Sequence, residues 1–179
     1  GEVCSNATRV FVQRSISDKF ITALVEKAEQ MVVGDPMAVD VHMGALISAT
    51  HLSKVLDYVQ IGVEEGARIA TGGKQIHPQG FENGHFMTPT IMTNCNDSMR
   101  ITREEIFGPV MSVLVFDDEQ DAIERANSTK FGLGAGVMTT DLSRAHRVAN
   151  ALVSGNVWVN SFNILPPGLP FGGAKQSGF

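Results

Sequence analysis

The stretch VMSVLVF, residues 110–116, decides the fold class of this chain. It is a continuous apolar run, and such a run is typical of a strand that is buried on both faces of a parallel sheet. We therefore expect a sheet with structure packed on either side of this strand.

On the N-terminal side of this run, strands and helices alternate. The residues TRVFVQ at 8–13 are rich in β-branched and aromatic side chains and predict a strand. Ser15 and Asp18 form a capping pattern for a following helix. The apolar face of that helix is expected to carry Phe20, Leu24, Ala28 and Met31, and the helix to end before Gly34 and Pro36.

A second helix is predicted to stop at Gly66, followed by a strand at 67–73 and an extended piece at 90–93. Its apolar face is expected to carry Leu52, Val55, Leu56, Val59 and Val63.

On the C-terminal side, Asp117 and Asp118 are predicted to cap a helix that runs to about Ala126. A strand at 132–138 and a helix from Asp141 follow, and then a strand at 156–160. One face of this helix is expected to carry Leu142, Ala145, Val148, Ala149 and Leu152. This alternation predicts an α/β fold with a mostly parallel sheet.

The tail LPPGLPFGGAKQSGF, residues 165–179, is too rich in proline and glycine for regular structure. We expect a shaped loop, and such loops often line functional sites. A simple exit linker is the alternative.

Composition excludes several classes of function. The net charge is −5, which argues against a nucleic-acid surface. No apolar run approaches the roughly 18 residues that span a bilayer, and no secretion signal is evident. Two cysteines suit a reducing compartment, so we expect a cytoplasmic protein. No cysteine and histidine spacing predicts zinc, and the five histidines are interpreted as surface residues.

Cys4, in GEVCSNAT, is a candidate nucleophile. Its neighbours are small and polar, which leaves a thiol accessible, and free backbone N–H groups at a turn would favour the thiolate. The alternative is an ordinary buried thiol that serves packing.

The stretch REEIFGPV, residues 103–110, is a second candidate site. It places two carboxylates, a phenylalanine and a Gly-Pro turn directly before the buried strand, where ligands bind in α/β proteins. A carboxylate there can accept hydrogen bonds from both hydroxyls of a ribose, and the phenyl ring can pack on a flat heterocycle. The alternative is a solvated acidic turn whose phenylalanine enters the core.

Five segments resemble, in order and spacing, the catalytic domain of the aldehyde dehydrogenase superfamily. They are GEVCSNATRVFVQ, REEIFGPVMSVLVF, NSTKFGLGAGVMTTDLSRAHRVA, GNVWVN and LPFGGAKQSGF. The resemblance runs from end to end and implies a three-layer, open, mostly parallel sheet with helices on both faces.

The resemblance also implies roles for single residues. Cys4 matches the nucleophile that attacks the aldehyde, with its own N–H as an oxyanion donor. Glu105 matches the residue that binds the nicotinamide ribose of NAD or NADP, and Phe107 the aromatic beside it. Three more positions match the substrate site and its aldehyde tunnel: Ser5, Leu165 and Phe171.

The resemblance and the sequence also bear on four further positions. The backbone carbonyls of Lys175 and Gly178 match positions that hold a monovalent cation such as potassium in some betaine-aldehyde members. Cys95 has no functional counterpart and is interpreted as a loop thiol. Trp158 and Asn160 are expected to serve packing and strand-end hydrogen bonding.

Within the superfamily, the N-terminal motif is most similar to the betaine-aldehyde and trimethylaminobutyraldehyde dehydrogenases. A quaternary ammonium substrate needs aromatic faces, and Phe171 is a candidate for one of them. Ala174 departs from the aromatic residue that is common at its position.

The cofactor-binding domain, the general-base glutamate and the oxyanion asparagine of this family lie N-terminal to the nucleophile. We therefore expect residues 1–179 to be the catalytic domain, excised from a longer dehydrogenase that forms a homodimer or homotetramer. A free-standing cysteine esterase and a non-catalytic interaction domain are the alternative hypotheses.

Overall fold

The run at 110–116 is strand β6 (Val110–Phe116) in a computed structural model that describes all 179 residues. The chain forms two units. The first comprises Gly1–Glu2 and Thr8–Val115, and the second comprises Val3–Ala7 and Phe116–Phe179.

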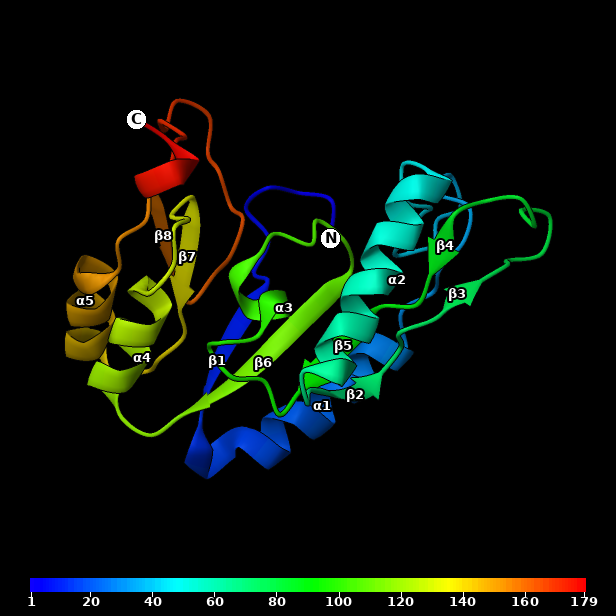
Figure 1. Cartoon of the computed structure of the whole chain (residues 1–179). Helices are drawn as coiled ribbons and strands as arrows, with labels where there is room; N and C mark the ends of the chain where they lie inside the picture. The colour runs from blue at the N-terminus through cyan, green and yellow to red at the C-terminus, as the bar shows by residue number, and fades with distance from the viewer. The chain divides into compact units, whose positions relative to one another are not determined.

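A four-stranded sheet organises the first unit, with the strand order β1-β6-β5-β2 (Figure 1). β1 is Arg9–Gln13, β2 is Arg68–Thr71 and β5 is Thr90–Thr93. β5 and β6 are parallel, whereas β2 is antiparallel to β5. The predicted strands at 8–13, 67–73, 90–93 and 110–116 are therefore confirmed as members of one sheet.

Helices cover both faces of this sheet. Consecutive residues of a strand point to opposite faces of the sheet, so the neighbours Ile91 and Met92 belong to two different hydrophobic clusters, one on each face. Ile91 packs with Val113 and with α1 (Ser17–Glu29). Met92 packs with Val55 of α2 (Ala49–Glu64) in the second cluster. β6 is thus buried on both faces, as its sequence predicts.

The start of α1 differs from the expectation. A 3₁₀ turn, η1 (Arg14–Ile16), precedes it, and no side chain caps the helix at Ile16. The predicted capping by Ser15 and Asp18 is therefore wrong, because the turn takes up the residues that a capping box would need. The helix also ends at Glu29, so Met31, which was expected on its apolar face, lies outside it and is exposed.

Both ends of α2 follow local sequence signals. The Ser48 hydroxyl accepts a hydrogen bond from the His51 N–H at 3.1 Å, which is an N-cap. Gly66 ends the helix with a φ of 102°, a conformation that glycine adopts without strain. Val63 was expected on the buried face but is exposed.

The segment between β2 and β5 contains a short antiparallel pair that the sequence does not predict. β3 is Gln75–Ile76 and β4 is Phe86–Met87, and both residues of β4 are buried. A single helical turn, α3 (Arg100–Arg103), comes before β6.

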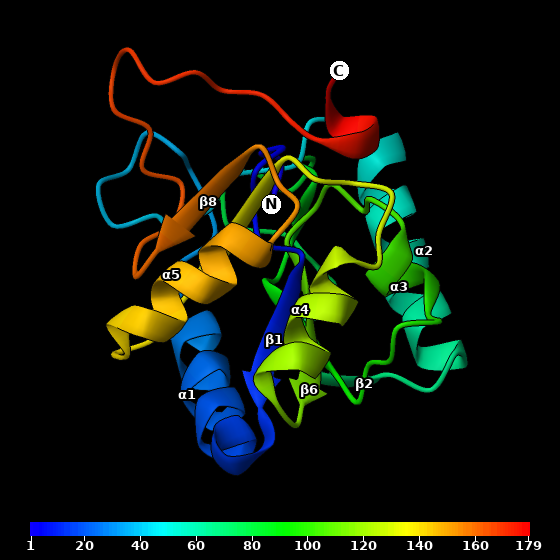
Figure 2. The same cartoon turned by 90° about the vertical axis from the view of Figure 1, so that its left-hand side faces the viewer.

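The second unit is built on the parallel pair β7 (Gly134–Val137) and β8 (Asn156–Val159), which α5 (Leu142–Ala151) connects. Figure 2 shows α5 against this pair and α4 (Glu119–Asn127) beside α5. The predicted strands at 132–138 and 156–160 are confirmed in shorter form. The parallel pairs β5–β6 and β7–β8 confirm an α/β fold with a mostly parallel sheet.

Capping in the second unit follows the sequence. Asp118 accepts a hydrogen bond from the Asp121 N–H, and Asp141 accepts one from the Arg144 N–H. Leu142, expected on the same face of α5 as the buried Ala145, has a side chain that is 73% exposed. The tail is largely irregular, but η2 (Lys175–Ser177) is a short 3₁₀ turn that was not expected. No helix of either unit has the length and apolar character to cross a bilayer.

Candidate active site

The predicted site residues fall into two sets. Glu105 and Phe107 belong to the first unit. The second unit carries the remaining positions: Cys4, Ser5, Leu165, Phe171, Lys175 and Gly178.

Cys4 lies in a tight turn of the second unit. The turn is closed by a hydrogen bond of 3.1 Å from the Asn6 N–H to the Val3 carbonyl. Cys4 is a free, exposed cysteine, and neither its thiol nor its N–H bonds to another group. An accessible thiol beside an unpaired N–H is an arrangement that can stabilise an oxyanion on an adduct of this sulfur.

The residues after Cys4 anchor the turn to the rest of the second unit. Ser5 is 5% exposed, so its side chain is buried rather than open to solvent. The Asn6 amide oxygen accepts a hydrogen bond of 3.0 Å from the side chain of Asn163. A Cβ on Gly134 would meet Trp158 at 3.0 Å and the Ser5 carbonyl at 3.5 Å, so this end of β7 packs closely on the turn.

Trp158 holds the first part of the tail. Its indole N–H donates to the Ile164 carbonyl at 2.8 Å, and its ring packs on Phe162 with a centroid distance of 5.0 Å. Leu165 follows this anchor and is 43% exposed, and Phe171 is 46% exposed. The packing role expected of Trp158 is confirmed. Asn160 exchanges two hydrogen bonds with the backbone of Thr139, which confirms its strand-end role.

The side chain of Lys175 is held in place by two hydrogen bonds to backbone carbonyls. Its ammonium donates to the carbonyls of Asn127 at 2.7 Å and Thr129 at 3.1 Å, at the C-terminal end of α4, where a positive charge is favourable. The α-carbon of Gly178 packs against the backbone of Gly173. No group of three or more acidic, histidine or cysteine side chains in the structure can hold a metal ion.

The two adjacent carboxylates before β6 have different environments. Glu104 accepts two hydrogen bonds of 2.9 Å from Arg100 and one of 2.7 Å from the Tyr58 hydroxyl. Glu105 is exposed and takes part in no hydrogen bond or ion pair. The Glu104 carboxylate is therefore occupied by hydrogen bonds within the protein, whereas the Glu105 carboxylate is free to accept hydrogen bonds from hydroxyl groups, as the predicted ribose binding requires.

The Glu104 contacts also perturb the ionisation of Tyr58. The hydrogen bond to the negative Glu104 carboxylate raises the pKa of the Tyr58 hydroxyl above its ordinary value. The same carboxylate raises the pKa of the Arg100 guanidinium.

Phe107 has an unusual backbone conformation. Its φ is 58°, in the left-handed region, which costs a residue with a side chain about 1–3 kcal/mol. Its ring is half-buried and meets the His51 ring edge to face, with a centroid distance of 6.4 Å. Strained residues of this kind cluster at functional sites, and the half-buried ring leaves one part open to a ligand.

The backbone at Phe107 and Gly108 is called the Phe107 turn below, and three residues around it were missed by the sequence analysis. His51 was interpreted as a surface residue, but its side chain is only 15% exposed and its Nε2 lies 2.6 Å from the Phe107 carbonyl. The Glu2 carboxylate lies 3.2 Å from the same nitrogen. Gly1 packs against the Gly108 backbone, where a side chain would not fit. The spacing of these residues in the sequence carries no signal of their contact.

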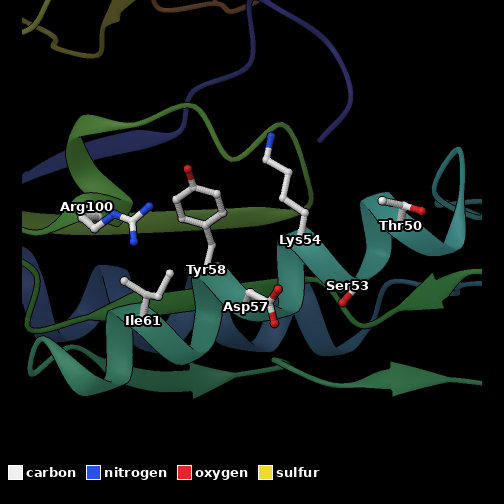
Figure 3. Close-up of a pocket in the computed structure, with 7 residues that line it drawn as sticks. All are labelled: Thr50, Ser53, Lys54, Asp57, Tyr58, Ile61 and Arg100. Atoms are coloured by element: carbon white, nitrogen blue, oxygen red, sulfur yellow. The ribbon is translucent and has the colours of Figure 1, made fainter.

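A shallow pocket of about 420 Å³ lies along the outer face of α2 (Figure 3). Lys54 and Arg100 lie on either side of the Tyr58 ring, at 5.8 Å and 5.5 Å from its centroid. None of the predicted site residues lines this pocket. It borders Glu104 through two of its lining residues, Tyr58 and Arg100.

Cys95 is unsuited to nucleophilic chemistry. Burial among the side chains of the larger core cluster raises the pKa of its thiol to about 11. Its sulfur donates a hydrogen bond to the Met92 carbonyl. At neutral pH the thiol is therefore protonated, in agreement with a packing role.

Comparison with known proteins identifies relatives along the whole chain. A sequence model of the aldehyde dehydrogenase family matches residues 1–179. The chain is 52% identical over 178 residues to a betaine aldehyde dehydrogenase of Mesorhizobium japonicum, covering 99% of this chain and 37% of the relative. It is 50% identical to a 4-trimethylaminobutyraldehyde dehydrogenase of Mus musculus, covering 100% of this chain and 37% of the relative.

The fold is similar to a crystal structure of betaine aldehyde dehydrogenase from Staphylococcus aureus in complex with NAD⁺, in which a cysteine is BME-modified. The TM-score is 0.96 at 43% identity, and the match covers 99% of this chain and 36% of that one. The present chain therefore spans a little over a third of the length of these relatives.

Proposed function

Because the chain belongs to the aldehyde dehydrogenase family, we propose that it is the nucleophile-bearing part of a longer enzyme that oxidises an aldehyde to a carboxylate. The observation that carries this proposal is the exposed Cys4 thiol with an unpaired N–H at the corner of its turn. The length of the relatives supports the presence of a separate cofactor-binding domain in the same enzyme.

Cys4 performs the first step in this proposal. Its thiolate attacks the aldehyde carbon and forms a thiohemiacetal, whose oxyanion accepts a hydrogen bond from the Cys4 N–H. A bound NAD would supply the acceptor for the hydride that leaves this carbon, and loss of the hydride leaves a thioester on Cys4. Water then hydrolyses the thioester on Cys4, which releases the carboxylate and restores the thiol.

Glu105 and Phe107 fit a bound nicotinamide nucleotide. The free Glu105 carboxylate can accept a hydrogen bond from each of two vicinal ribose hydroxyls, and the half-buried Phe107 ring offers an apolar surface for a flat heterocycle. We assign NAD rather than NADP, a choice supported by the NAD⁺ complex of the structural relative.

The proposed substrate is an aldehyde that carries a quaternary ammonium group, such as betaine aldehyde or 4-trimethylaminobutyraldehyde. The names of the relatives at about half identity support this class. Phe171 and Leu165 expose apolar surface in the tail, and an aromatic face attracts such a cation. Ser5 is the weaker substrate candidate, since its side chain is buried.

The remaining parts of the proposal are a cytoplasmic location and assembly as a homodimer or homotetramer. Two free cysteines support a reducing compartment. A potassium ion on the carbonyls of Lys175 and Gly178 stays a prediction, and the rate of the enzyme in sodium and in potassium buffers tests it.

The direct test uses the full-length enzyme with NAD and each of the two aldehydes. We expect NADH formation with both, and none from the Cys4→Ala variant. An enzyme that forms no NADH from either aldehyde, but hydrolyses esters through Cys4, would support the esterase hypothesis instead.

A further inference from the structure

The side chain of His51 contacts the Phe107 turn directly. Its Nε2 lies 2.6 Å from the Phe107 carbonyl and 3.2 Å from the Glu2 carboxylate. Both partners are acceptors, so this nitrogen carries a proton and donates to them. The Phe107 carbonyl, which β6 does not pair, is thereby satisfied.

The position of His51 is itself fixed by the first turn of α2. Its N–H donates to the Ser48 hydroxyl that caps the helix. Val55, one turn later on the same face, fills the space beside Gly108, where an added Cβ would lie 2.6 Å from a Val55 methyl group. One face of α2 therefore contacts two consecutive residues of the turn, Phe107 through His51 and Gly108 through Val55.

Glu2 ties this arrangement to a third segment. The oxygen that faces His51 also accepts a hydrogen bond of 3.3 Å from the Ile47 N–H. Its side chain is 28% exposed, and Gly1 before it packs on Gly108. The segment Gly1–Glu2, the start of α2 and the Phe107 turn thus meet at one imidazole.

We propose that His51, held by Glu2, is a positioning residue that keeps the Phe107 turn in its left-handed conformation and so sets where Glu105 presents its carboxylate. This inference rests on the proposed function, in which Glu105 binds the nicotinamide ribose. A strained turn persists only where its surroundings over-determine it, and His51 supplies a hydrogen bond to the strained residue itself.

The test is made on the full-length enzyme with His51→Leu, which removes the donor, and His51→Gln, which keeps an N–H donor on a side chain of similar reach. We expect His51→Leu to slow hydride transfer on the order of a hundredfold, as a displacement of about an ångström does, and to enlarge the isotope effect of a deuterated aldehyde. His51→Gln is expected to recover most of the rate.

Two readouts separate positioning from loss of structure. Alkylation of Cys4 by iodoacetamide without NAD should keep its rate in His51→Leu, because this reaction does not use the turn. The effects of His51→Leu and Glu2→Leu should be non-additive, since both act through one contact. The matched control is His146→Leu, at an exposed histidine of α5 that bonds to no other group, and it should behave as wild type.

Glu105→Gln is measured beside these variants. If Glu105→Gln impairs hydride transfer and His51→Leu does not, the positioning inference is wrong while the proposed function stands. If neither variant changes hydride transfer, the ribose role and the inference are both wrong. Equal losses of Cys4 alkylation and hydride transfer in His51→Leu, without recovery in His51→Gln, would mean that His51 only supports folding.

Discussion

At the scale of single residues, two pairs of chemically identical side chains differ in what surrounds them. Cys4 is exposed in a turn and Cys95 is packed in a core cluster. The carboxylate of Glu105 is free, whereas that of its neighbour Glu104 accepts hydrogen bonds from Arg100 and Tyr58. Each pair therefore provides a test with its own internal control.

The two thiols should differ in reactivity. We expect iodoacetamide to alkylate Cys4 in the folded protein, while Cys95 reacts only after unfolding, because burial keeps its pKa at about 11 and leaves almost no thiolate at neutral pH. Mass spectrometry of the alkylated peptides measures both. In the full-length enzyme, Cys4→Ala should abolish activity and Cys95→Ala should retain it. Loss of activity in Cys95→Ala with normal stability would contradict the assignment of the nucleophile.

The two carboxylates should separate cofactor binding from stability. Glu105→Gln in the full-length enzyme should weaken NAD binding by roughly 1.5–3 kcal/mol for each charge-assisted hydrogen bond that is lost, with an unchanged melting temperature. Glu104→Gln should lower the melting temperature instead. Titration of NADH fluorescence measures binding, and differential scanning calorimetry measures the melting temperature. Weaker binding in Glu104→Gln together with a lower melting temperature in Glu105→Gln would show that the two roles are the other way round.

Tyr58 offers a further readout, because it is the single tyrosine of the 179-residue chain. The Glu104 carboxylate raises its pKa, so its ultraviolet absorbance should titrate at higher pH than free tyrosine. In Glu104→Gln the pKa should fall towards the ordinary value. A titration that is the same in both proteins would show that the hydrogen bond between Tyr58 and Glu104 does not form.

At the scale of elements, close packing and ion pairs join neighbouring segments. α2 meets the turn before β6 at Val55 and Gly108. In the second unit, Glu119 of α4 pairs with Arg144 and Arg147 of α5. The first contact is buried apolar packing, so we expect it to respond to changes in side-chain size. The second is an exposed set of ion pairs, so we expect it to respond to pH.

Gly108→Ala should destabilise the protein by about 1–3 kcal/mol, the usual cost of overpacking, since the new Cβ would lie 2.6 Å from Val55. Val55→Ala on the Gly108→Ala background should recover part of the loss, because it removes the methyl groups that collide. Gly172→Ala is the control, since a Cβ there meets no atom within 4 Å. Urea unfolding measures all of these variants, and additive losses in the double variant would show that the two residues do not collide.

The ion pair between α4 and α5 predicts a dependence of stability on pH. Hydrogen bonds from Arg147, followed by those from Arg144, lower the pKa of the Glu119 carboxyl from 4.5 to about 2. The stabilisation is therefore complete above the ordinary pKa and is lost as the pH falls from about 4.5 to about 2. Glu119→Gln should reduce this acid sensitivity, measured as the urea midpoint against pH. An unchanged pH profile would show that the pair contributes nothing to stability.

At the scale of the whole molecule, the chain spans a little over a third of the length of its relatives. The proposed cofactor-binding domain belongs to the remaining length of the enzyme. The isolated chain of 179 residues should therefore produce no NADH from an aldehyde, although its Cys4 should still be alkylated. The full-length enzyme is the positive control, and turnover by the isolated chain would overturn the assignment of the cofactor-binding domain.

The sequence by itself determined the features that depend on neighbours along the chain. The apolar run of β6, the glycine that ends α2 and the aspartates that cap α4 and α5 are local signals, and the structure confirms them. The motifs around Cys4 and Glu105 likewise identified the family, because their residues are contiguous. Even at this level, η1 displaced the predicted cap of α1.

Tertiary structure alone decided which residues of each motif are free to act. The sequence presents Glu104 and Glu105 as equivalent, and only the fold brings the distant Tyr58 of α2 to the first of them, which already pairs locally with Arg100. His51 is far from Phe107 in the sequence, and only the packing of α2 brings its ring to the Phe107 carbonyl. Periodicity also placed Leu142 on the apolar face of α5, but the fold leaves its side chain 73% exposed. The physical reason is common to all three: hydrogen bonding and burial depend on side chains that distant segments supply.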